Sequence, residues 1–286
     1  MARTDPSAPR RAGVVGSPVG HSLSPVLHGT AYRALGLDWP YERIERDAAG
    51  LAEMAPQLGP EWAGLSVTMP GKRAALELAA ESTERAAAVG AANTLTRRGD
   101  GSWSADCTDV DGVAGALRSA AGFAGGATAL LLGAGGTAVA ALAAFAELGL
   151  GEVVLAVREP ARAAEAEATA RRVGVAVRTE RIDELDLAGA AAAADVVVST
   201  LPAGGVDPHA AALAKAPHVL DVVYHPWPTP LATAVERAGG RLATGLDMLL
   251  HQSFGQVEQF TGLPAPRERM RDALVEATGG ELALPL

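Results

Sequence analysis

The chain has 286 residues and a formal net charge of −9, with 49% hydrophobic and 20% charged residues. This composition is typical of a globular protein with enough apolar side chains for two cores, and its acidic balance disfavours a nucleic-acid partner. The single cysteine, Cys107, excludes an internal disulfide and a thiolate zinc site, and the spacing of the histidines predicts no metal site.

The first part of the chain alternates strand and helix signals. Met1 to Arg11 is basic and contains proline with no apolar core after it, which indicates a frayed tail rather than a signal peptide, and a cytoplasmic location is expected. Ser24 is predicted as the N-cap of a helix with Pro25 at its first position, and Gly36 ends that helix. The predicted strands, whose alternation with helices is typical of a parallel sheet, are Ala12–Val15, Tyr41–Glu45 and Gly64–Val67.

A hairpin is predicted next. Asn93–Arg97 and Trp103–Cys107 flank a turn centred near Asp100, where glycine and aspartate suit a tight reversal. This pairing places Asn93 and Asp109 at the same open end of the hairpin. A helix then carries the chain into a second domain.

A glycine-rich turn opens this second domain. It follows the apolar run Ala127–Leu132, precedes a predicted helix over Thr137–Leu148, and consists of Gly133, Ala134, Gly135, Gly136, Thr137 and Ala138. The spacing fits G-x-G-x-x-[GA], in which backbone N–H groups and the positive end of a helix dipole face a pyrophosphate. The pattern alone also fits a simple connector, but the strand predicted over Glu152–Val157 completes a βαβ unit.

Further strands and a long helix follow. Strands are predicted at Asp195–Thr200 and His218–Val223, and a helix beyond Gly245 has an apolar face, with Gln252 on its opposite, polar face. The charge-free stretch from Ser119 to Ala146 is long enough for a membrane span, but its glycines break the run and no span is predicted.

Polar residues of the first domain lie where predicted strands end or helices begin: Ser22, Ser24, Thr68, Lys72, Asn93 and Asp109. Functional groups gather at such positions in parallel sheets. Hydroxyl and amide groups can bind hydroxyl or carboxylate oxygens, and a lysine with a carboxylate can shuttle a proton, so the set suits a small polyhydroxylated acid. Purely structural interpretations are also open. Ser24 could serve only as a helix cap, a role that Ser22 does not have, and Lys72 could be a solvated surface charge.

Motifs in a fixed order run along nearly the whole chain. They are Gly16–Pro25 with His28, Ser66–Lys72, Gly90–Thr94, Thr108 with Asp109, the glycine turn, Asp221–Tyr224 with Thr229–Leu231, and Gly245–Gln252. This series resembles the shikimate dehydrogenase family. The resemblance implies a two-domain α/β fold: a substrate-binding catalytic domain (1–112), a Rossmann-type doubly wound dinucleotide-binding domain (113–245), and carboxy-terminal helices (246–286) that return to the first domain.

The resemblance also implies a reversible, NADP-linked reduction of 3-dehydroshikimate to shikimate in aromatic amino-acid biosynthesis. Lys72 would be the catalytic acid/base and Asp109 its partner. Ser22 and Ser24 would hold the substrate carboxylate, and the other implied substrate contacts are Thr68, Asn93, Tyr224 and Gln252. The implied cofactor contacts are Gly133, Ala134, Gly135, Gly136, Thr137, Arg158, Arg162 and Gly245.

Some positions depart from the family pattern. Ser66 and Cys107 stand where the family usually has Asn, and we expect an altered hydrogen-bond network rather than lost activity. Arg158 and Arg162 match the basic pair that clamps the 2′-phosphate of NADP, but Glu159 replaces a threonine. A carboxylate there could repel the phosphate or accept from a free ribose hydroxyl, as in NAD sites; alternatively it points to solvent and pairs with Arg162. NADP is favoured, with NAD left open.

Other functions stay open beside this one. A quinate or aminoshikimate dehydrogenase with NAD preference would share these motifs. A non-catalytic nicotinamide-sensing protein would share the fold but has no use for Lys72 with Asp109. A methylenetetrahydrofolate dehydrogenase is expected to carry a Tyr-x-x-x-Lys helix, which this sequence lacks. The expected partner is a small-molecule substrate, with no nucleic acid or membrane, and the chain is expected to be a monomer or homodimer.

Overall fold

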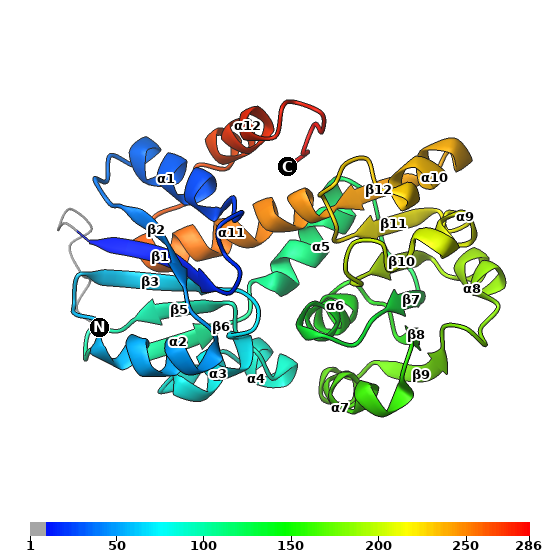
Figure 1. Ribbon diagram of the computed structural model, residues 1–286, viewed down its shortest axis with the longest axis horizontal. Helices are drawn as coiled ribbons and strands as arrows, with labels where there is room; N and C mark the ends of the chain where they lie inside the picture. Colours follow the sequence, from blue (N-terminus) through cyan, green and yellow to red (C-terminus); the bar gives the residue numbers. More distant parts are fainter. Residues whose placement is uncertain (1–9) are drawn as a thin grey trace. The chain divides into compact units, whose positions relative to one another are not determined.

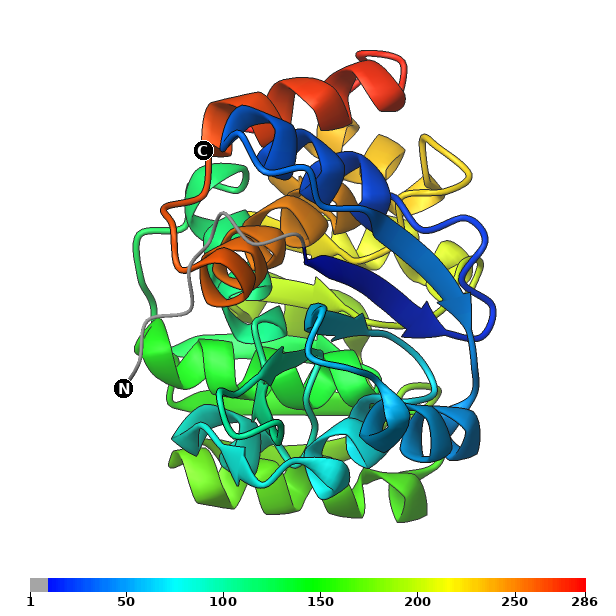
Figure 2. The same ribbon diagram turned by 90° about the vertical axis from the view of Figure 1, so that its left-hand side faces the viewer.

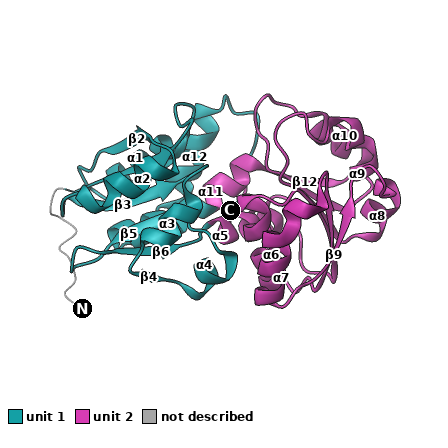
Figure 3. Ribbon diagram, turned by 60° about the horizontal axis from the view of Figure 1, so that its bottom comes forward, with its two compact units in different colours: residues 1–108, 252–284, 286 teal, residues 109–251, 285 magenta. Residues whose placement is uncertain are grey.

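The computed structural model describes residues 10–286, so the predicted amino-terminal tail lies almost entirely outside the described residues. The chain divides into two compact units (Figure 3). The first unit comprises the described residues up to Thr108 together with residues 252–284, and the second comprises residues 109–251. Each unit contains one six-stranded sheet.

The first unit is built on a mixed sheet with the strand order β2-β1-β3-β5-β6-β4. β1 pairs in parallel with β2 and β3, whereas β5 runs antiparallel to both β3 and β6. The predicted hairpin is confirmed: Arg97 of β5 pairs with Trp103 of β6, which centres the turn on Asp100. The strands are β1 (Arg11–Gly16), β2 (Tyr41–Glu45), β3 (Trp62–Val67), β4 (Glu81–Ser82), β5 (Thr94–Arg97) and β6 (Trp103–Asp106).

Helices cover both faces of this sheet (Figures 1 and 2). α1 packs against α12 on one face, and α2 packs against α3 on the other. The core beneath α2 contains Leu51 of that helix with Leu65, Leu95 and Trp103 of the sheet, all buried. The helices are α1 (Ser24–Ala34), α2 (Ala48–Met54), the 3-10 turn η1 (Ala55–Gln57), α3 (Lys72–Leu78), α4 (Glu84–Val89) and α12 (Arg267–Ala277).

The second unit has an all-parallel sheet with the strand order β12-β11-β10-β7-β8-β9. This is the order of a Rossmann-type doubly wound fold, so the predicted fold class is confirmed. The direction of winding reverses between β7 and β10, which is where such folds bind ligands. The strands are β7 (Thr128–Leu132), β8 (Glu152–Val157), β9 (Ala176–Arg181), β10 (Val196–Ser199), β11 (His218–Asp221) and β12 (Arg241–Thr244).

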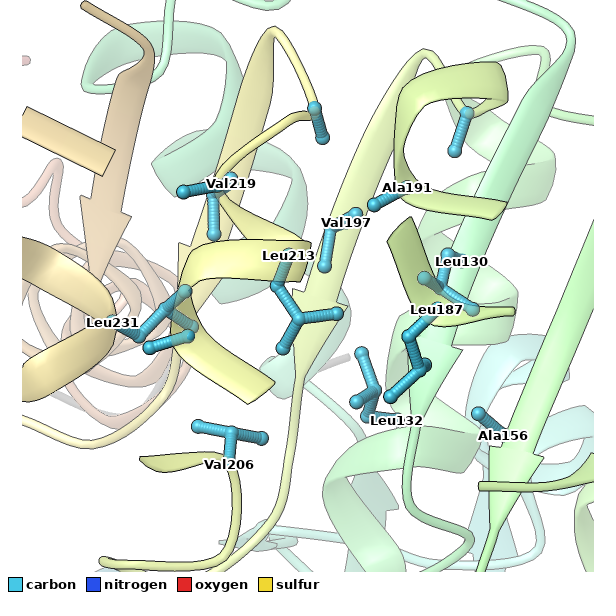
Figure 4. Close-up of a cluster of buried hydrophobic side chains, with 14 of the residues drawn as sticks. Leu130, Leu132, Ala156, Leu187, Ala191, Val197, Val206, Leu213, Val219 and Leu231 are labelled. Atoms are coloured by element: carbon cyan, nitrogen blue, oxygen red, sulfur yellow. The ribbon is translucent and has the colours of Figure 1, made fainter. Parts of the chain in front are cut away.

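Val and Leu dominate these strands because helices cover both faces of the sheet. Figure 4 shows Leu130, Val197 and Val219 of three neighbouring strands packed against Leu187 and Leu213 of the helices above them. Burying each such side chain stabilises the fold by about 1.5–3 kcal/mol. The helices of this unit are α5 (Asp109–Ser119), α6 (Gly136–Glu147), η2 (Pro160–Ala163), α7 (Ala164–Val173), α8 (Leu187–Ala193), η3 (Asp207–His209), α9 (Ala210–Leu213) and α10 (Pro230–Ala238).

The helix α11 (Gly245–Thr261) begins in the second unit and continues into the first from Gln252 onward. With α12 it forms the predicted carboxy-terminal return to the first unit. The charge-free stretch from Ser119 to Ala146 forms β7 and most of α6. Among residues 10–286, no helix combines the length and apolarity that a membrane crossing requires.

The start of α1 corrects one prediction. Ser24 is the first residue of the helix rather than its N-cap, and the N-cap position belongs to Leu23, which makes no side-chain cap hydrogen bond. Instead, the Ser22 hydroxyl accepts a hydrogen bond from the Ser24 backbone N–H at 3.3 Å. The capping role predicted for Ser24 is therefore taken by Ser22, because the Ser22 hydroxyl reaches a free N–H group in the first turn of the helix.

Candidate functional site

The loop that carries Ser22 is tied to strand β2. Glu45 of β2 accepts hydrogen bonds from the Ser17 hydroxyl at 2.7 Å and from the Val19 backbone N–H at 3.0 Å. Arg43 of the same strand donates twice to the Ser22 carbonyl, at 2.7 and 3.0 Å. The hydrogen bonds from Ser17 and Val19 lower the pKa of the Glu45 carboxyl group. These contacts hold the half-buried Ser22 and the buried Ser24 beside the carboxyl end of β1.

Thr68 and Lys72 lie at the carboxyl end of β3. The Thr68 backbone N–H donates to the Val15 carbonyl of β1 at 2.8 Å, and Lys72 opens α3. The Lys72 carbonyl accepts from the Ala92 N–H at 2.9 Å, one residue before Asn93. A lysine at the positive end of a helix works against the helix dipole, so helix stability alone gives no reason for it.

Asn93 is the centre of a hydrogen-bond cluster in the first unit. Its Oδ1 accepts from the Thr94 hydroxyl at 2.8 Å, the Thr108 N–H at 2.8 Å and the Thr108 hydroxyl at 3.1 Å. Its Nδ2 donates to Gln252 Oε1 at 2.7 Å. Because the Thr108 N–H can only donate, the orientation of the Asn93 amide is determined by its partners.

Gln252, the partner of Asn93, shows what the predicted polar face of α11 contacts. Gln252 does lie on a polar face of the helix, but this face lies against the polar residues of the first unit, and Gln256 one turn later is only 3% exposed. Gln252, Gln256 and Gln259 recur at spacings of four and three residues, so a polar stripe was visible in the sequence. Periodicity marks a face but does not say whether that face meets water or buried polar groups.

Other predicted site residues belong to the second unit. Asp109 is the first residue of α5 and is 2% exposed, while Lys72 belongs to the first unit. Tyr224 follows β11 and is half-buried, and this burial raises the pKa of its hydroxyl. Gly245 lies against it: a Cβ there would meet the Val222 carbonyl oxygen at 2.0 Å and the Tyr224 ring at 2.7 Å. Only glycine allows this close approach.

The glycine turn lies directly after β7, at the point where the winding of the sheet reverses. Gly133 has φ +101°, and a Cβ there would lie 2.5 Å from the Thr200 hydroxyl of the loop after β10. Gly135 is the N-cap of the 12-residue helix α6 and provides no side-chain cap. Ala134, Gly136 and Thr137 complete an exposed or half-exposed turn, whereas Ala138 is fully buried, as its place in the motif requires.

The carboxyl end of β8 carries the predicted basic pair. Arg158, Glu159 and Arg162 are all exposed, and the Arg162 N–H donates to the Glu159 carbonyl at 3.0 Å. The Glu159 carboxylate acts on Arg181 at the end of the neighbouring strand β9, where Asp183, Glu184 and Glu159 together raise the pKa of the guanidinium group. Glu159 therefore interacts electrostatically with Arg181, a residue of the sheet.

The sequence analysis missed Tyr41 and Gln256 as parts of this site. Tyr41 donates to the Ser66 hydroxyl at 2.7 Å, and Ser66 donates to Gln256 Oε1 at 2.9 Å. His28, which the motif series contains, reaches the same oxygen at 3.1 Å. Ser66, which stands where the family usually has Asn, is therefore part of a buried hydrogen-bond network in this chain.

Comparison with known proteins places the chain in a family. Residues 14–95 match the shikimate dehydrogenase substrate binding domain, and residues 245–275 match the shikimate 5'-dehydrogenase C-terminal domain. A shikimate dehydrogenase (NADP(+)) of Methylobacterium radiotolerans is 38% identical over 94% of this chain and 98% of its own length. The chain belongs to the shikimate dehydrogenase family. A second family member, from Citrifermentans bemidjiense, is 39% identical over 92% of this chain and 93% of its own length.

Solved structures of the shikimate dehydrogenase family agree with the fold. Mycobacterium tuberculosis shikimate dehydrogenase is 56% identical and covers 94% of this chain and 100% of its own, with a TM-score of 0.88. The Thermus thermophilus enzyme in complex with NADP(H) and shikimate is 31% identical over 94% of this chain and 99% of its own, with a TM-score of 0.80. A quinate dehydrogenase from Corynebacterium glutamicum in complex with NAD is 30% identical over 93% and 99% of the two chains, with a TM-score of 0.83.

Proposed function

We propose that the protein is a shikimate dehydrogenase that interconverts 3-dehydroshikimate and shikimate with NADP, in aromatic amino-acid biosynthesis. The curated relatives named above carry that name. The observation that carries the proposal is the hydrogen bond from Asn93 to Gln252, because it brings together two expected substrate contacts 159 residues apart in the sequence. The first unit supplies most of the substrate contacts, and the second unit binds the dinucleotide.

The residues of the second unit fit a dinucleotide. The turn at Gly133 has a positive φ, no Cβ fills the space at Gly135, and α6 begins without a side-chain cap. A pyrophosphate held there would accept from the first N–H groups of the helix. Arg158 and Arg162 at the end of β8 would hold the 2′-phosphate of NADP. When bound, NADP(H) supplies or removes the hydride of the reaction.

The chain's own groups bind the acid and move the proton. Ser22 and Ser24 donate hydroxyl hydrogen bonds to the substrate carboxylate, and Thr68, Asn93, Tyr224 and Gln252 orient the ring hydroxyls. Lys72 donates a proton to the carbonyl oxygen as it becomes a hydroxyl, and Asp109 is its acid–base partner. Positioned proton transfer of this kind contributes about 10²- to 10⁴-fold to rate.

One steady-state experiment tests this function. Shikimate and quinate are each assayed with NADP and with NAD, and kcat/KM is compared across the four combinations. We expect the value for shikimate with NADP to be the highest, and to exceed that for shikimate with NAD by at least about tenfold, because NAD lacks the 2′-phosphate and with it a charge-assisted contact. Dinucleotide binding without turnover of either acid would instead indicate a sensing protein.

A second candidate function is a quinate dehydrogenase that prefers NAD. Glu159 favours it, because this exposed carboxylate stands beside Arg158, where it would repel a 2′-phosphate or accept from a free ribose hydroxyl. The Corynebacterium glutamicum quinate dehydrogenase was solved with NAD. The highest kcat/KM for quinate with NAD in the same assay would establish this candidate and overturn the first.

A further inference from the structure

One buried amide connects two parts of the proposed substrate site. Gln256 Oε1 accepts from the Ser66 hydroxyl at 2.9 Å and is 3.1 Å from His28 Nε2. Gln256 Nε2 donates to the Asn93 carbonyl at 3.3 Å and to the Thr94 hydroxyl at 3.3 Å. All these residues belong to the first unit, and Gln256, Ser66 and His28 are 3%, 4% and 0% exposed.

The partners determine how the Gln256 amide is oriented. The Asn93 carbonyl can only accept, so the NH₂ group must face it. Burial lowers the pKa of His28 to about 3, and the ring is therefore neutral near pH 7. Gln256 Oε1 can only accept, so His28 Nε2 carries the ring proton and donates it at 3.1 Å, and Nδ1 is left to accept from the Tyr32 hydroxyl 3.5 Å away. The NH₂ group of Gln256 therefore faces acceptors, and its Oε1 faces donors.

The network reaches both sets of expected substrate contacts. On one side, Tyr41 donates to Ser66 at 2.7 Å, and the Ser24 side chain interacts with the Tyr41 phenol, which lowers the Tyr41 pKa against the larger effect of burial. On the other side, Thr94 donates to Asn93 Oδ1, and Asn93 donates to Gln252. The polar network thus extends from the serine that would hold the carboxylate to the amides that would hold ring hydroxyls.

We propose that Gln256 is a positioning residue for shikimate, and that Ser66 and then Tyr41 transmit the position of its amide to Ser24. Neither residue needs to touch the substrate. This inference rests on the proposed function, because it concerns how the same site is held in place. In this chain Ser66 accepts from Tyr41 and donates to Gln256, so these buried polar groups are satisfied.

The test compares two glutamines of one helix. Gln256→Met keeps the length of the side chain but removes both the donor and the acceptor that Asn93 and Ser66 need. Gln259→Met is the matched control, because Gln259 donates to Asp106 Oδ2 at 2.7 Å and accepts from the Thr96 hydroxyl at 3.5 Å, so its partners differ from those of Gln256. Both variants remove a hydrogen-bonded amide from α11, so both lower thermal stability.

We expect Gln256→Met to reduce kcat/KM for shikimate by about 10- to 100-fold, since small misplacements of contact groups have effects of that size. The KM for the dinucleotide should stay within twofold of the wild-type value, as a rough limit for a site in the other unit. Tyr41→Phe should also raise the KM for shikimate, but by a smaller factor than Gln256→Met does. Gln259→Met should leave both KM values unchanged despite its lower melting temperature.

Binding of shikimate measured by calorimetry gives a second readout that needs no turnover. A wild-type protein that neither binds nor oxidises shikimate would refute the proposed function itself. An active wild-type protein whose Gln256→Met variant is folded and keeps the wild-type KM and kcat would overturn the positioning role alone. Equal losses in the Gln256 and Gln259 variants would also overturn it, because they would indicate a general loss of stability.

Discussion

At the scale of single residues, Lys72 stands out by composition as well as by position. The chain has 24 lysine and arginine residues, of which only Lys72 and Lys215 are lysines. Lys215 is exposed, whereas Lys72 is half-buried and opens α3 directly after the Thr68 loop. An ammonium group can release its proton, which a guanidinium group cannot do near neutral pH, so a proton donor here must be lysine rather than arginine.

We expect Lys72→Ala to lower kcat by about 10²- to 10⁴-fold, because it removes the proton donor of the proposed mechanism while the binding groups remain. Lys215→Ala is the control and should keep the wild-type kcat, because its side chain is exposed. Steady-state rates, with circular dichroism to check folding, provide the measurement. A folded Lys72→Ala protein with wild-type kcat would remove Lys72 from the mechanism.

At the scale of elements, the proposed selection between NADP and NAD rests on the ends of β8 and β9. Arg181 pairs with Val157 across these strands, and the turn that follows β8 presents Arg158 and Arg162. Asp183 and Glu184 form ion pairs with Arg181 at 2.7 and 3.1 Å, and Glu159 acts on the same group. Because Asp183 and Glu184 already pair with Arg181, the single positive charge of Arg181 does not offset Glu159, and the repulsion between Glu159 and a 2′-phosphate has to be tested directly.

Arg162→Ala should raise the KM for NADP by about tenfold or more while changing the KM for NAD little, because a charge-assisted bond to the 2′-phosphate contributes about 1.5–3 kcal/mol. Glu159→Thr should shift the preference further toward NADP. Arg178→Ala, which removes an exposed arginine elsewhere on β9, serves as the control. Equal changes in the KM values for both dinucleotides in Arg162→Ala would contradict a contact with the phosphate.

At the scale of the whole molecule, buried polar groups couple the fold to pH. His28 is fully buried and stacks on Tyr41 at 4.2 Å between ring centroids. Its pKa falls from 6.5 to about 3 because burial disfavours the charged ring, although the bond to Gln256 opposes this. The unfolded chain therefore binds a proton between these two pH values that the folded chain does not bind. Stability contributed by neutral His28 is complete above pH 6.5 and is lost as pH falls toward 3.

The free energy of unfolding of the first unit should fall by up to about 1.4 kcal/mol per pH unit below pH 6 from this residue. Urea unfolding followed by tryptophan fluorescence measures it, because Trp39, Trp62 and Trp103 are all buried in that unit. His28→Gln should reduce the slope of the free energy of unfolding against pH by the equivalent of about one proton. His225→Gln, at an exposed position, should leave this slope unchanged. Identical slopes in all three proteins would contradict this assignment.

Much of the fold followed from local patterns. Apolar runs predicted four of the six strands of the Rossmann unit, and the boundaries of β8 agree with those expected. The hairpin turn at Asp100 was predicted because glycine and aspartate there permit only a tight reversal. The predicted start of α1 was wrong by one residue. The sequence offers the hydroxyls of both Ser22 and Ser24, and only the structure shows that the Ser22 hydroxyl reaches a free N–H group.

The sequence by itself determined the family, the order of the elements and the strand ends at which polar side chains gather, because periodicity and motif spacing are local properties. Only the tertiary structure decided which of those side chains meet. Asn93 and Gln252 are joined, and Gln256, Ser66 and Tyr41 connect them to Ser24. The reason is physical: buried amides and hydroxyls must find partners, and those partners come from segments far apart in the chain.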